Sequence, residues 1–375
     1  TNAVVMAVEK KDAMTLNGSI FEKNTTSQQR SILVDQPLTN VSGSWSVTLN
    51  GAGVGTQIAV GGVDYLLTEA DLAAVKVTND LKGMLKTTLS ANAIVLDKTF
   101  EPDAAIYLDG VNGSDSNDGL TPDTAVLTFA KAKSLLASKA VSGGNNWIYI
   151  TNTVFITKDE SWSLKGIDGA KIMRGDTFKR YMIVLGNDNA SADESGNLTL
   201  SDITIDGNGG WNNVTNSPMI RVNNSTLTIN DGTVLCNNGN GMTGNSTGGA
   251  LYVCALRDYT PTVIMNGGVI EGNYTTTSAG GVYLTGAAAT FIMNGGEIRN
   301  NVSRKGAGIT DNTGCNVRLN GGKIYGNTLT SNMIYAASSQ ICIGSATRGA
   351  NCGDFILKPA VELPANEICL GGKGQ

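Results

Sequence analysis

The sequence contains no histidine, and its charged residues are scarce. Asp, Glu, Lys and Arg make up 16% of the 375 residues, below the share of about a quarter that is usual in soluble domains. Because histidine is absent and none of the six cysteines forms a Cys-x-x-Cys pair, a zinc site is not expected. The net charge is -5 and no Lys/Arg cluster occurs, so nucleic acid and anionic membranes are poor partners. No apolar run is long enough for a membrane span.

The first residues lack a start methionine and the basic region of a secretory leader. We expect Thr1 to begin a mature or trimmed chain. Glycine is frequent, with 47 residues, and Asn, Thr and Ser are abundant, so amides and hydroxyls rather than charges keep the surface soluble. This composition is typical of secreted β-rich proteins and argues against a helical bundle. We therefore expect an extracellular or cell-surface location.

All six cysteines lie in the second half of the chain: Cys236, Cys254, Cys315, Cys342, Cys352 and Cys369. An even number of cysteines in a chain of secreted character favours disulfides over buried thiols. Cys342 and Cys352 bracket a loop and are the first candidate pair, although the connectivity cannot be deduced from sequence.

One phrase recurs along the second half: an apolar strand, Asn, Gly-Gly, a short apolar strand and a second Asn. Full copies occupy residues 263–273, 291–301 and 317–327, and weaker copies occupy 227–238, 203–207 and 355–358. The phrase asparagines are 28 residues apart between Asn266 and Asn294, which fits one coil of three strands. Longer spacings elsewhere require loops inserted at one turn. A fixed phrase with a variable period predicts a solenoid with side loops.

Stacked coils bring equivalent residues to about 4.8 Å from one another. The asparagines of the phrase are therefore expected to form two ladders of side-chain amides, each bonding the amide above and below. The two predicted ladders contain Asn266, Asn294 and Asn320, and Asn273, Asn301 and Asn327. The glycines supply turn conformations that other residues avoid.

An apolar strand and an Asx- and Gly-rich turn at residues 106–122 precede the repeats. Residues 126–140 then have the spacing of an amphipathic helix, whose start Thr121 or Asp123 can cap. The face expected to cover the open end of the solenoid carries Phe129, Ala132, Leu135 and Leu136.

These features resemble the entry of pectate-lyase-like right-handed parallel β-helix proteins, and the likeness extends over about residues 105–370. The repeat phrase is most similar to surface and adhesin-like β-helix proteins of Gram-positive bacteria. The resemblance implies an all-β chain whose right-handed parallel β-helix has three strands per coil and an N-terminal capping helix. It implies little about function, because the superfamily includes lyases, hydrolases, phage tailspikes and adhesins.

Three parts are therefore predicted. Residues 1–100 form a small β-rich domain, for which a sandwich is one arrangement, with strands at 31–34, 44–49, 56–60 and 93–96 and an ambiguous stretch at 68–86. Residues 101–146 contain the entry strand, the turn and the capping helix. Residues 147–375 form the parallel β-helix.

Evidence for catalysis is weak. The hydrolases of this superfamily resemble one another in clustered aspartates with a nearby histidine, which this sequence lacks. Asp202 and Asp206 are the only weak catalytic candidates, since two carboxylates on one strand can serve acid/base chemistry. The favoured alternative places Asp206 at the asparagine-ladder position and Asp202 in a turn.

A calcium site is a second weak alternative, and no other cofactor is expected. Asp109, Asp115 and Asp118 lie in one turn, but Val126 stands where a calcium loop has its twelfth-position Glu. Asx-rich turns usually cap themselves, so no bound metal is the favoured expectation.

Outward-facing residues are the candidates for ligand binding. Tyr252 and Tyr283 are expected to point outward on consecutive coils, as aromatic platforms for carbohydrate. Glu271, Arg299 and Tyr325 are expected to form an exposed column, in which Glu271 and Arg299 can pair. A solvated salt bridge is the favoured interpretation of that pair. Trp211 adds a possible loop contact.

We predict an extracellular, non-enzymatic surface protein: an adhesin-like protein or a structural subunit of a filament or surface assembly, with carbohydrate or cell-surface glycans as partners. A polysaccharide lyase or glycoside hydrolase is the first alternative, and a phage tailspike or receptor-binding protein is the second. Residues 1–8 contain an apolar run from Ala3 to Val8, and this segment is expected to pair with a sheet edge. Pairing within its own domain is favoured over self-association with a neighbouring molecule.

Overall fold

The computed structural model describes residues 19–21, 33–34, 37–38, 45–49, 57–78, 85–98, 101–186, 195–209, 217–239, 249–256, 258–275, 277–329, 340–343, 355–359, 361–362 and 368–370. The chain divides into two compact units after Glu101. Residues 1–8, Trp211 and Cys352, all named in sequence predictions, lie outside the described residues.

Parallel strands in three sheets build the second unit. Sheet A contains β8 (Ala104–Asp109), β9 (Asn146–Asn152), β12 (Ala170–Arg174), β15 (Ile203–Asp206), β18 (Thr233–Cys236), β21 (Val269–Glu271), β24 (Glu297–Arg299), β28 (Gly322–Tyr325) and β32 (Val361–Glu362). Sheet B contains β10 (Val154–Ile156), β13 (Ile183–Leu185), β16 (Ile220–Val222), β19 (Leu251–Cys254), β22 (Val282–Thr285), β26 (Ile309–Asp311), β30 (Ile341–Ile343) and β33 (Ile368–Leu370). Sheet C contains β11 (Glu160–Trp162), β14 (Leu198–Leu200), β17 (Thr226–Ile229), β20 (Thr262–Met265), β23 (Thr290–Met293), β27 (Asn316–Leu319) and β31 (Phe355–Leu357). A further parallel pair consists of β25 (Val302–Ser303) and β29 (Thr328–Leu329).

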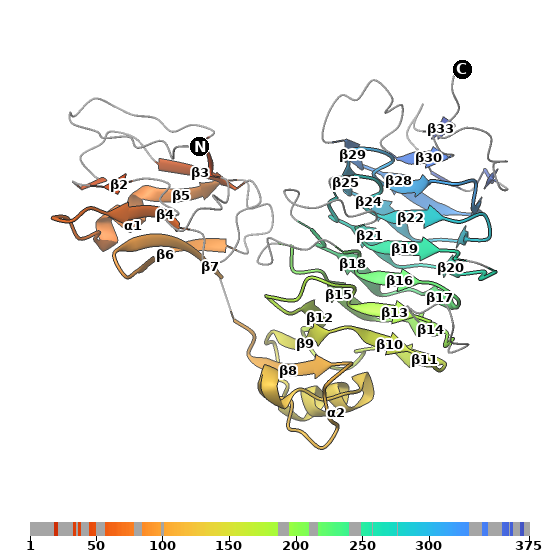
Figure 1. The fold of residues 1–375 in the computed structure, drawn as a ribbon, viewed down its shortest axis with the longest axis horizontal. Helices are drawn as coiled ribbons and strands as arrows, with labels where there is room; N and C mark the ends of the chain where they lie inside the picture. Colours follow the sequence, from red (N-terminus) through yellow and green to blue (C-terminus); the bar gives the residue numbers. More distant parts are fainter. Residues whose placement is uncertain are drawn as a thin grey trace. The chain divides into compact units, whose positions relative to one another are not determined.

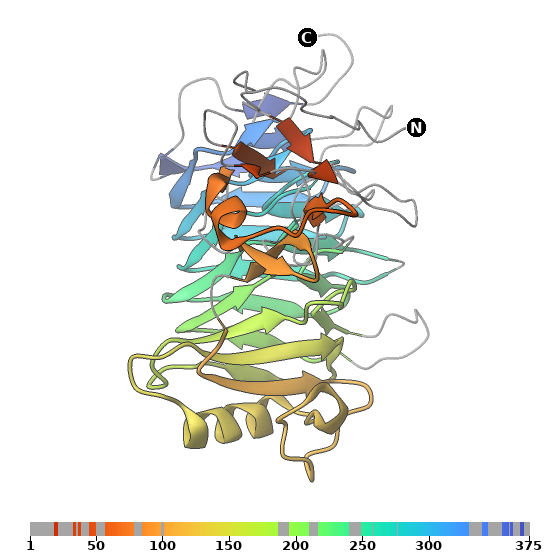
Figure 2. The ribbon, with the colours of Figure 1, turned by 90° about the vertical axis from the view of Figure 1, so that its left-hand side faces the viewer.

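Successive strands rotate through the three sheets. After β20 in sheet C the chain enters β21 in sheet A and β22 in sheet B, and it then returns to sheet C at β23, beside β20 (Figure 1). Figure 2 shows the strands of successive coils stacked in the same order. Stacked parallel sheets with this rotation are consistent with the predicted parallel β-helix. The stack begins at β8, within the segment expected to be only an entry strand.

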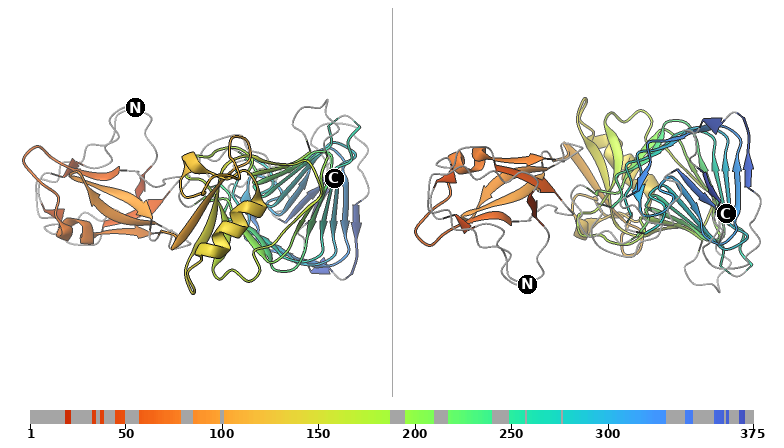
Figure 3. Two further views of the ribbon diagram at one scale, coloured as in Figure 1. Left: turned by 90° about the horizontal axis from the view of Figure 1, so that it is seen from below. Right: turned by 90° about the horizontal axis from the view of Figure 1, so that it is seen from above.

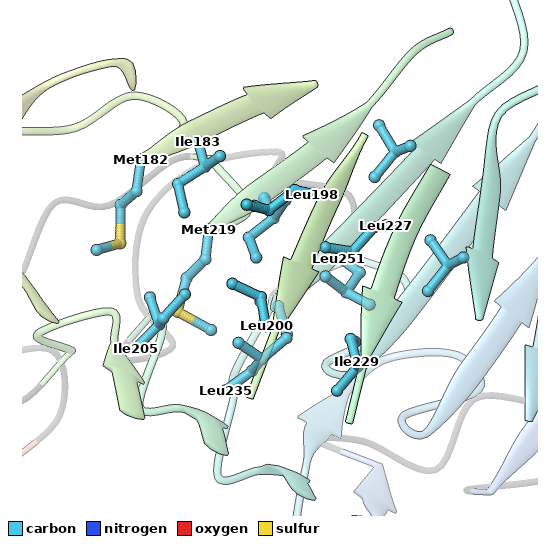
Figure 4. Packing of buried hydrophobic residues seen from close by; sticks show 14 of the residues in the cluster. Met182, Ile183, Leu198, Leu200, Ile205, Met219, Leu227, Ile229, Leu235 and Leu251 are labelled. Carbon is cyan, nitrogen blue, oxygen red and sulfur yellow. The ribbon is translucent and has the colours of Figure 1, made fainter. Parts of the chain in front are cut away.

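One hydrophobic core fills the space between the three sheets. Alternation along each strand selects its members: in β20, Val263 and Met265 are fully buried, whereas Thr262 and Ile264 are partly exposed. Figure 4 shows the same packing among the earlier coils, where residues such as Leu200 gather between strands of different sheets. Because each buried aliphatic side chain stabilises the fold by about 1.5–3 kcal/mol, the core is the main source of coil stability.

Helix α2 (Phe129–Lys139) packs on β8 and β9 at the first end of the stack, and Figure 3, seen from below, shows it in front of the coils. Its Phe129 ring stacks on Trp162 at a centroid distance of 4.4 Å. The predicted capping helix is present, but it starts three residues later than expected. Its N-cap is Thr128, whose hydroxyl accepts from the Lys131 N–H at 3.2 Å. The predicted cap Thr121 instead begins the short 3-10 helix η2 (Pro122–Thr124).

An outer ladder of asparagines joins consecutive coils between sheets C and A. Asn320 Nδ2 donates to Asn294 Oδ1 at 2.8 Å, Asn294 Nδ2 donates to Asn266 Oδ1 at 2.9 Å, and Asn266 Nδ2 donates to Asn230 Oδ1 at 3.0 Å. The predicted register of these three asparagines is confirmed, and Asn230 is a fourth rung.

The second glycine of each complete phrase follows this ladder with a positive φ: 76° at Gly268, 83° at Gly296 and 99° at Gly322. A Cβ on Gly296 would lie 2.6 Å from the Gly268 carbonyl oxygen of the preceding coil. Glycine is therefore required here by both conformation and space.

An inner ladder is buried between sheets A and B. Asn273 Nδ2 donates to Asn301 Oδ1, and Asn301 Nδ2 donates to Asn327 Oδ1, each at 2.9 Å. These three side chains are at most 2% exposed. Asn327 Nδ2 donates in turn to Gln340 Oε1 at 2.6 Å, so a glutamine continues the predicted ladder by one coil. Each ladder amide also bonds backbone groups of the turns, as Asn301 Nδ2 does with the Ile270 carbonyl at 3.0 Å.

The sequence prediction for Asp206 was wrong in register. Asp206 ends β15 in sheet A and pairs with Cys236, so it lies in the column of Glu271 rather than in the outer asparagine ladder. Ser201 follows β14 as Asn230 follows β17. The error arose because the sequence of β15 resembles the apolar strand that precedes the turn of the phrase, whereas β15 is the strand that follows the turn.

The first unit has a short helix, α1 (Glu69–Ala74), and two small sheets. One sheet contains β1 (Ser19–Phe21), β3 (Trp45–Leu49) and β5 (Val75–Thr78), and the other contains β2 (Leu33–Val34), β4 (Gln57–Gly61), β7 (Ala93–Lys98) and β6 (Leu85–Ser90). The unit is β-rich as predicted, and the ambiguous stretch at 68–86 contains α1, β5 and the start of β6.

Asp71 organises the start of α1. Its fully buried carboxylate accepts from the Leu38 N–H at 2.6 Å, from the Tyr65 hydroxyl at 2.7 Å and from the Thr68 N–H at 2.8 Å. Thr68 completes the capping box by accepting from the Asp71 N–H at 3.3 Å. Burial raises the pKa of Asp71, but the hydrogen bonds from Tyr65, Thr68 and Leu38 outweigh it and hold the pKa below its usual value.

The expectation of disulfides is not met in the described part of the chain. No disulfide joins any two of the described cysteines Cys236, Cys254, Cys315 and Cys342, and the suggested bond between Cys342 and Cys352 involves a residue outside the described ranges. Cys254 and Cys315 are fully covered by protein and pack as small apolar residues. The even number of cysteines was a poor guide to disulfides, because a continuous core stabilises these coils without cross-links. No helix in the described ranges is long and apolar enough to span a membrane.

Candidate binding surface

A column of large side chains lies on the outer face of sheet B. Arg221, Tyr252 and Tyr283 occupy equivalent central positions in β16, β19 and β22. Tyr181, just before β13, joins them: its ring is parallel to that of Tyr252 within 9°, with a centroid distance of 6.5 Å. The Arg221 guanidinium carbon lies 5.3 Å from the Tyr181 ring centre and 5.7 Å from that of Tyr252. The four residues form what we call the tyrosine–arginine column.

Local sequence explains the placement of this column. The strands Ile220-Arg221-Val222 and Leu251-Tyr252-Val253 each set one large polar residue between two fully buried aliphatic residues. Because side chains alternate along a strand, the central residue points away from the core. Parallel in-register pairing then aligns these central residues from coil to coil.

The predicted platform Tyr283 is covered rather than open, with 7% of its surface exposed. Its ring centre lies 5.6 Å from that of Tyr252, and burial raises the pKa of its hydroxyl to about 12. Tyr252 is half-buried, and burial together with a hydrogen bond to Cys254 raises its pKa. Tyr283 therefore supports the column from one end, and Tyr181, Arg221 and Tyr252 offer the accessible part.

Sequence reasoning missed Tyr181 and Arg221. Arg221 was detectable, because it stands in the same apolar–large–apolar triplet as Tyr252. Tyr181 carried no such signal, since it precedes its strand and reaches the column from a turn.

The predicted charged column on sheet A is also present. Glu271, Arg299 and Tyr325 are in register on β21, β24 and β28. Arg299 Nε donates to Glu271 Oε2 at 2.9 Å, and its Nη1 donates to Glu297 Oε2 at 2.7 Å. The Tyr325 hydroxyl donates to the same Glu297 oxygen at 3.0 Å. Glu297 was not predicted, although its place two residues before Arg299 puts it on the same face of β24.

In these bonds, the side-chain polar atoms of the charged column mostly bind one another. Hydrogen bonds with Tyr325 and Glu271 raise the pKa of Arg299, which stays charged at every physiological pH. The side chains of Glu271, Glu297 and Arg299 are each about one-third exposed. The favoured interpretation, a partly solvated ion-pair network, fits this geometry better than a ligand site.

The two catalytic candidates each lie beside a different lysine. Asp202 lies in the turn before β15 with a φ of 46°, and its carboxylate is 3.5 Å from Lys165 Nζ. Asp206 is 5% exposed and lies 3.2 Å from Lys171 Nζ. Its Oδ1 accepts from Asn208 N–H at 2.9 Å and from Asn237 Nδ2 at 2.8 Å. Asp206 therefore fixes turns between sheets A and B.

Each of the three calcium candidates accepts hydrogen bonds from the protein, Asp109 and Asp118 within their own turns and Asp115 at the start of α2. Asp109 Oδ1 accepts from the backbone N–H of Val111 and of Asn112, and Asp118 Oδ1 accepts from the Leu120 N–H. Asp115 accepts from the backbone of Leu127 and Thr128 and from the Thr128 hydroxyl. Burial raises the pKa of Asp115, but the hydrogen bonds from Thr128 and Leu127 outweigh it and hold the pKa below its usual value. In the described ranges, no three Cys, Asp or Glu side chains are grouped to hold a metal ion.

One buried cation ties several turns together. Arg174, at the end of β12, is fully buried. Its Nε donates to the Gly207 carbonyl at 3.2 Å, its Nη2 donates to Asn238 Oδ1 at 2.9 Å, and its Nη1 donates to the Arg180 carbonyl. Burial lowers its pKa to about 9. Oxygen acceptors on three sides fit a structural clamp.

No protein-family model, no curated protein sequence and no solved structure matches this chain. The geometry of sheets A and B is therefore the basis for assigning a function.

Proposed function

We propose that this chain is an extracellular, non-enzymatic surface protein, adhesin-like or part of a surface assembly, that binds carbohydrate on the outer face of sheet B. The coils then form a right-handed parallel β-helix of the pectate-lyase-like kind, as the entry segment and repeat phrase suggest. The observation that carries the proposal is the packing of Tyr181, Arg221 and Tyr252 side by side on consecutive coils.

The chemistry of the column suits a saccharide. Apolar faces of pyranose rings pack on aromatic rings, and a guanidinium donates several hydrogen bonds in fixed directions to ring hydroxyls or carboxylates. The rings of Tyr181 and Tyr252 are held in place by stacking before a ligand binds, so little side-chain entropy is lost on binding. Repetition along the coils suits a polymer, because successive sugar units meet successive strands.

Other features support a structural rather than catalytic scaffold. The candidate carboxylates Asp202 and Asp206 are committed to salt bridges and turn hydrogen bonds. The continuous core and two amide ladders favour a stiff element that displays its faces. The low charge and abundant hydroxyl and amide side chains suit an extracellular location.

The experiment is a glycan array and polysaccharide panel probed with the wild type and with Tyr252→Ala. The expected result is binding to at least one glycan, reduced at least about fivefold by Tyr252→Ala, since one aromatic contact is worth about 1 kcal/mol beyond its area of burial. Glu271→Gln on sheet A is the matched control and should bind like the wild type. Equal loss in both variants, or no binding by a folded wild type, would refute the proposed surface.

A further inference from the structure

The outer asparagine ladder contains three chemically labile dipeptides. In each complete phrase the ladder asparagine precedes a glycine: Asn266–Gly267, Asn294–Gly295 and Asn320–Gly321. Asn-Gly is the dipeptide most prone to deamidation, because a glycine lacks the side chain that hinders attack by its backbone nitrogen. All three asparagines are exposed or partly exposed.

The backbones of the three dipeptides are closely matched. Each glycine N–H donates to a carbonyl of the preceding coil, at 3.3 Å for Gly267, 3.3 Å for Gly295 and 3.2 Å for Gly321. The preceding asparagine N–H shares that same carbonyl at 2.7–2.8 Å in every case. The backbone hydrogen bonds therefore do not distinguish the three sites.

Side-chain bonding distinguishes them. Asn266 and Asn294 each donate through Nδ2 and accept through Oδ1, so two ladder bonds fix each amide. Asn320 donates to Asn294, but its Oδ1 accepts no hydrogen bond within the part of the chain that the structure describes. On the next coil Lys358 takes the equivalent place, since its N–H donates to the Leu319 carbonyl at 2.9 Å as the Asn320 N–H does to Met293.

From this difference we infer that Asn320 is a site of spontaneous deamidation and that the ladder orders the reaction from its last rung inward. The Gly321 nitrogen attacks Asn320 Cγ, the Cγ–Nδ2 bond breaks, and Nδ2 leaves as ammonia with the proton of the glycine N–H. Water then opens the cyclic imide to aspartate or isoaspartate. Rotation of the amide toward the glycine breaks one ladder bond at Asn320 and two at Asn294. One net hydrogen bond corresponds to about a fivefold difference in rate.

The product changes the next rung. A carboxylate at position 320 replaces the donor Nδ2 with an oxygen that faces the acceptor Asn294 Oδ1. Asn294 then keeps only its bond to Asn266 and becomes the new end of the ladder. Deamidation should therefore proceed in the order Asn320, Asn294, Asn266.

Peptide mapping by mass spectrometry after incubation of the folded chain in mildly alkaline buffer tests this order. Asn320 should deamidate about fivefold faster than Asn294 and Asn266, by the loss of one bond. Asn112, in an exposed Asn-Gly turn outside the ladder, is the positive control. Buried Asn301, which precedes Val302, is the negative control and should remain intact.

Lys358→Asn adds a rung that donates to Asn320 Oδ1, and it should slow deamidation at Asn320 to the rate at Asn294. Lys358→Ala removes the lysine without adding an amide and should leave the Asn320 rate unchanged. Equal rates at the three ladder sites would overturn the inference, as would unchanged Asn320 deamidation in a folded Lys358→Asn variant.

Discussion

Arg299 on β24 donates from Nε to Glu271 on β21, one coil earlier, at 2.9 Å, and from Nη1 to Glu297 on its own strand at 2.7 Å. One cation thus separates two carboxylates that would otherwise repel each other. We expect Arg299→Met to lower the free energy of unfolding by about 1 kcal/mol, because these side chains are partly solvated. Urea denaturation in low and high salt checks this, and the deficit should shrink in high salt. An effect independent of salt would show that packing, not charge, is responsible.

The two amide ladders should differ in their importance for stability. Asn301→Ala leaves buried turn groups without partners and should destabilise the coils by about 2–4 kcal/mol. Asn294→Ala, in the exposed outer ladder, should cost about 1 kcal/mol or less because water replaces the lost partners. Thermal or denaturant unfolding of the two matched variants gives the comparison. Equal losses would contradict the assignment of the inner ladder as the structural one.

The first unit should weaken in acid through Asp71. Its folded pKa is depressed, so the unfolded state binds more protons as the pH falls, and stability present above about pH 4 is lost below it. Asp71→Asn should lower stability at neutral pH by about 1–3 kcal/mol and flatten this acid dependence. Hydrogen exchange of peptides covering α1, measured against pH, reports on it. An unchanged acid dependence in the variant would assign it to another carboxylate.

Tyr65 should act in the opposite direction at high pH. Burial and its bond to Asp71 raise the pKa of this hydroxyl to about 12, so the folded unit keeps a proton that the unfolded chain loses near pH 10. Stability therefore falls as the pH rises between about 10 and 12. Tyr65→Phe should remove this alkaline loss, which the same exchange experiment measures.

Arg174 should be hard to replace. Arg174→Met removes donors from the Gly207 carbonyl, the Arg180 carbonyl and Asn238 Oδ1. The buried acceptors left behind should cost about 2–4 kcal/mol, more than is gained by removing a desolvated cation. Lys165→Met, which replaces an exposed cation of the same unit, is the control and should be nearly neutral. A more stable Arg174→Met variant would mean that desolvation dominates.

Much of the second unit was predictable because the same residues recur at the same positions of the repeated phrase. The Asn-Gly-Gly phrase fixes the turn between sheets C and A, and strict alternation identifies the inward residues, so Asn266, Asn294 and Asn320 were placed correctly. The prediction for Asp206 failed because β15 resembles the apolar strand that precedes the turn of the phrase. The prediction of disulfides failed because it relied on the even number of cysteines and did not consider the continuous core. Tyr181 was missed because side chains that reach a surface from a turn leave no periodic signal.

Hydrogen–deuterium exchange of the wild type, with and without each member of a polysaccharide panel, tests the central claim most directly. Binding on the tyrosine–arginine column should slow exchange in the peptides that contain β16 and β19 and leave those containing β21 and β24 unchanged. Protection confined to sheet A, or no protection by any polysaccharide, would contradict the account.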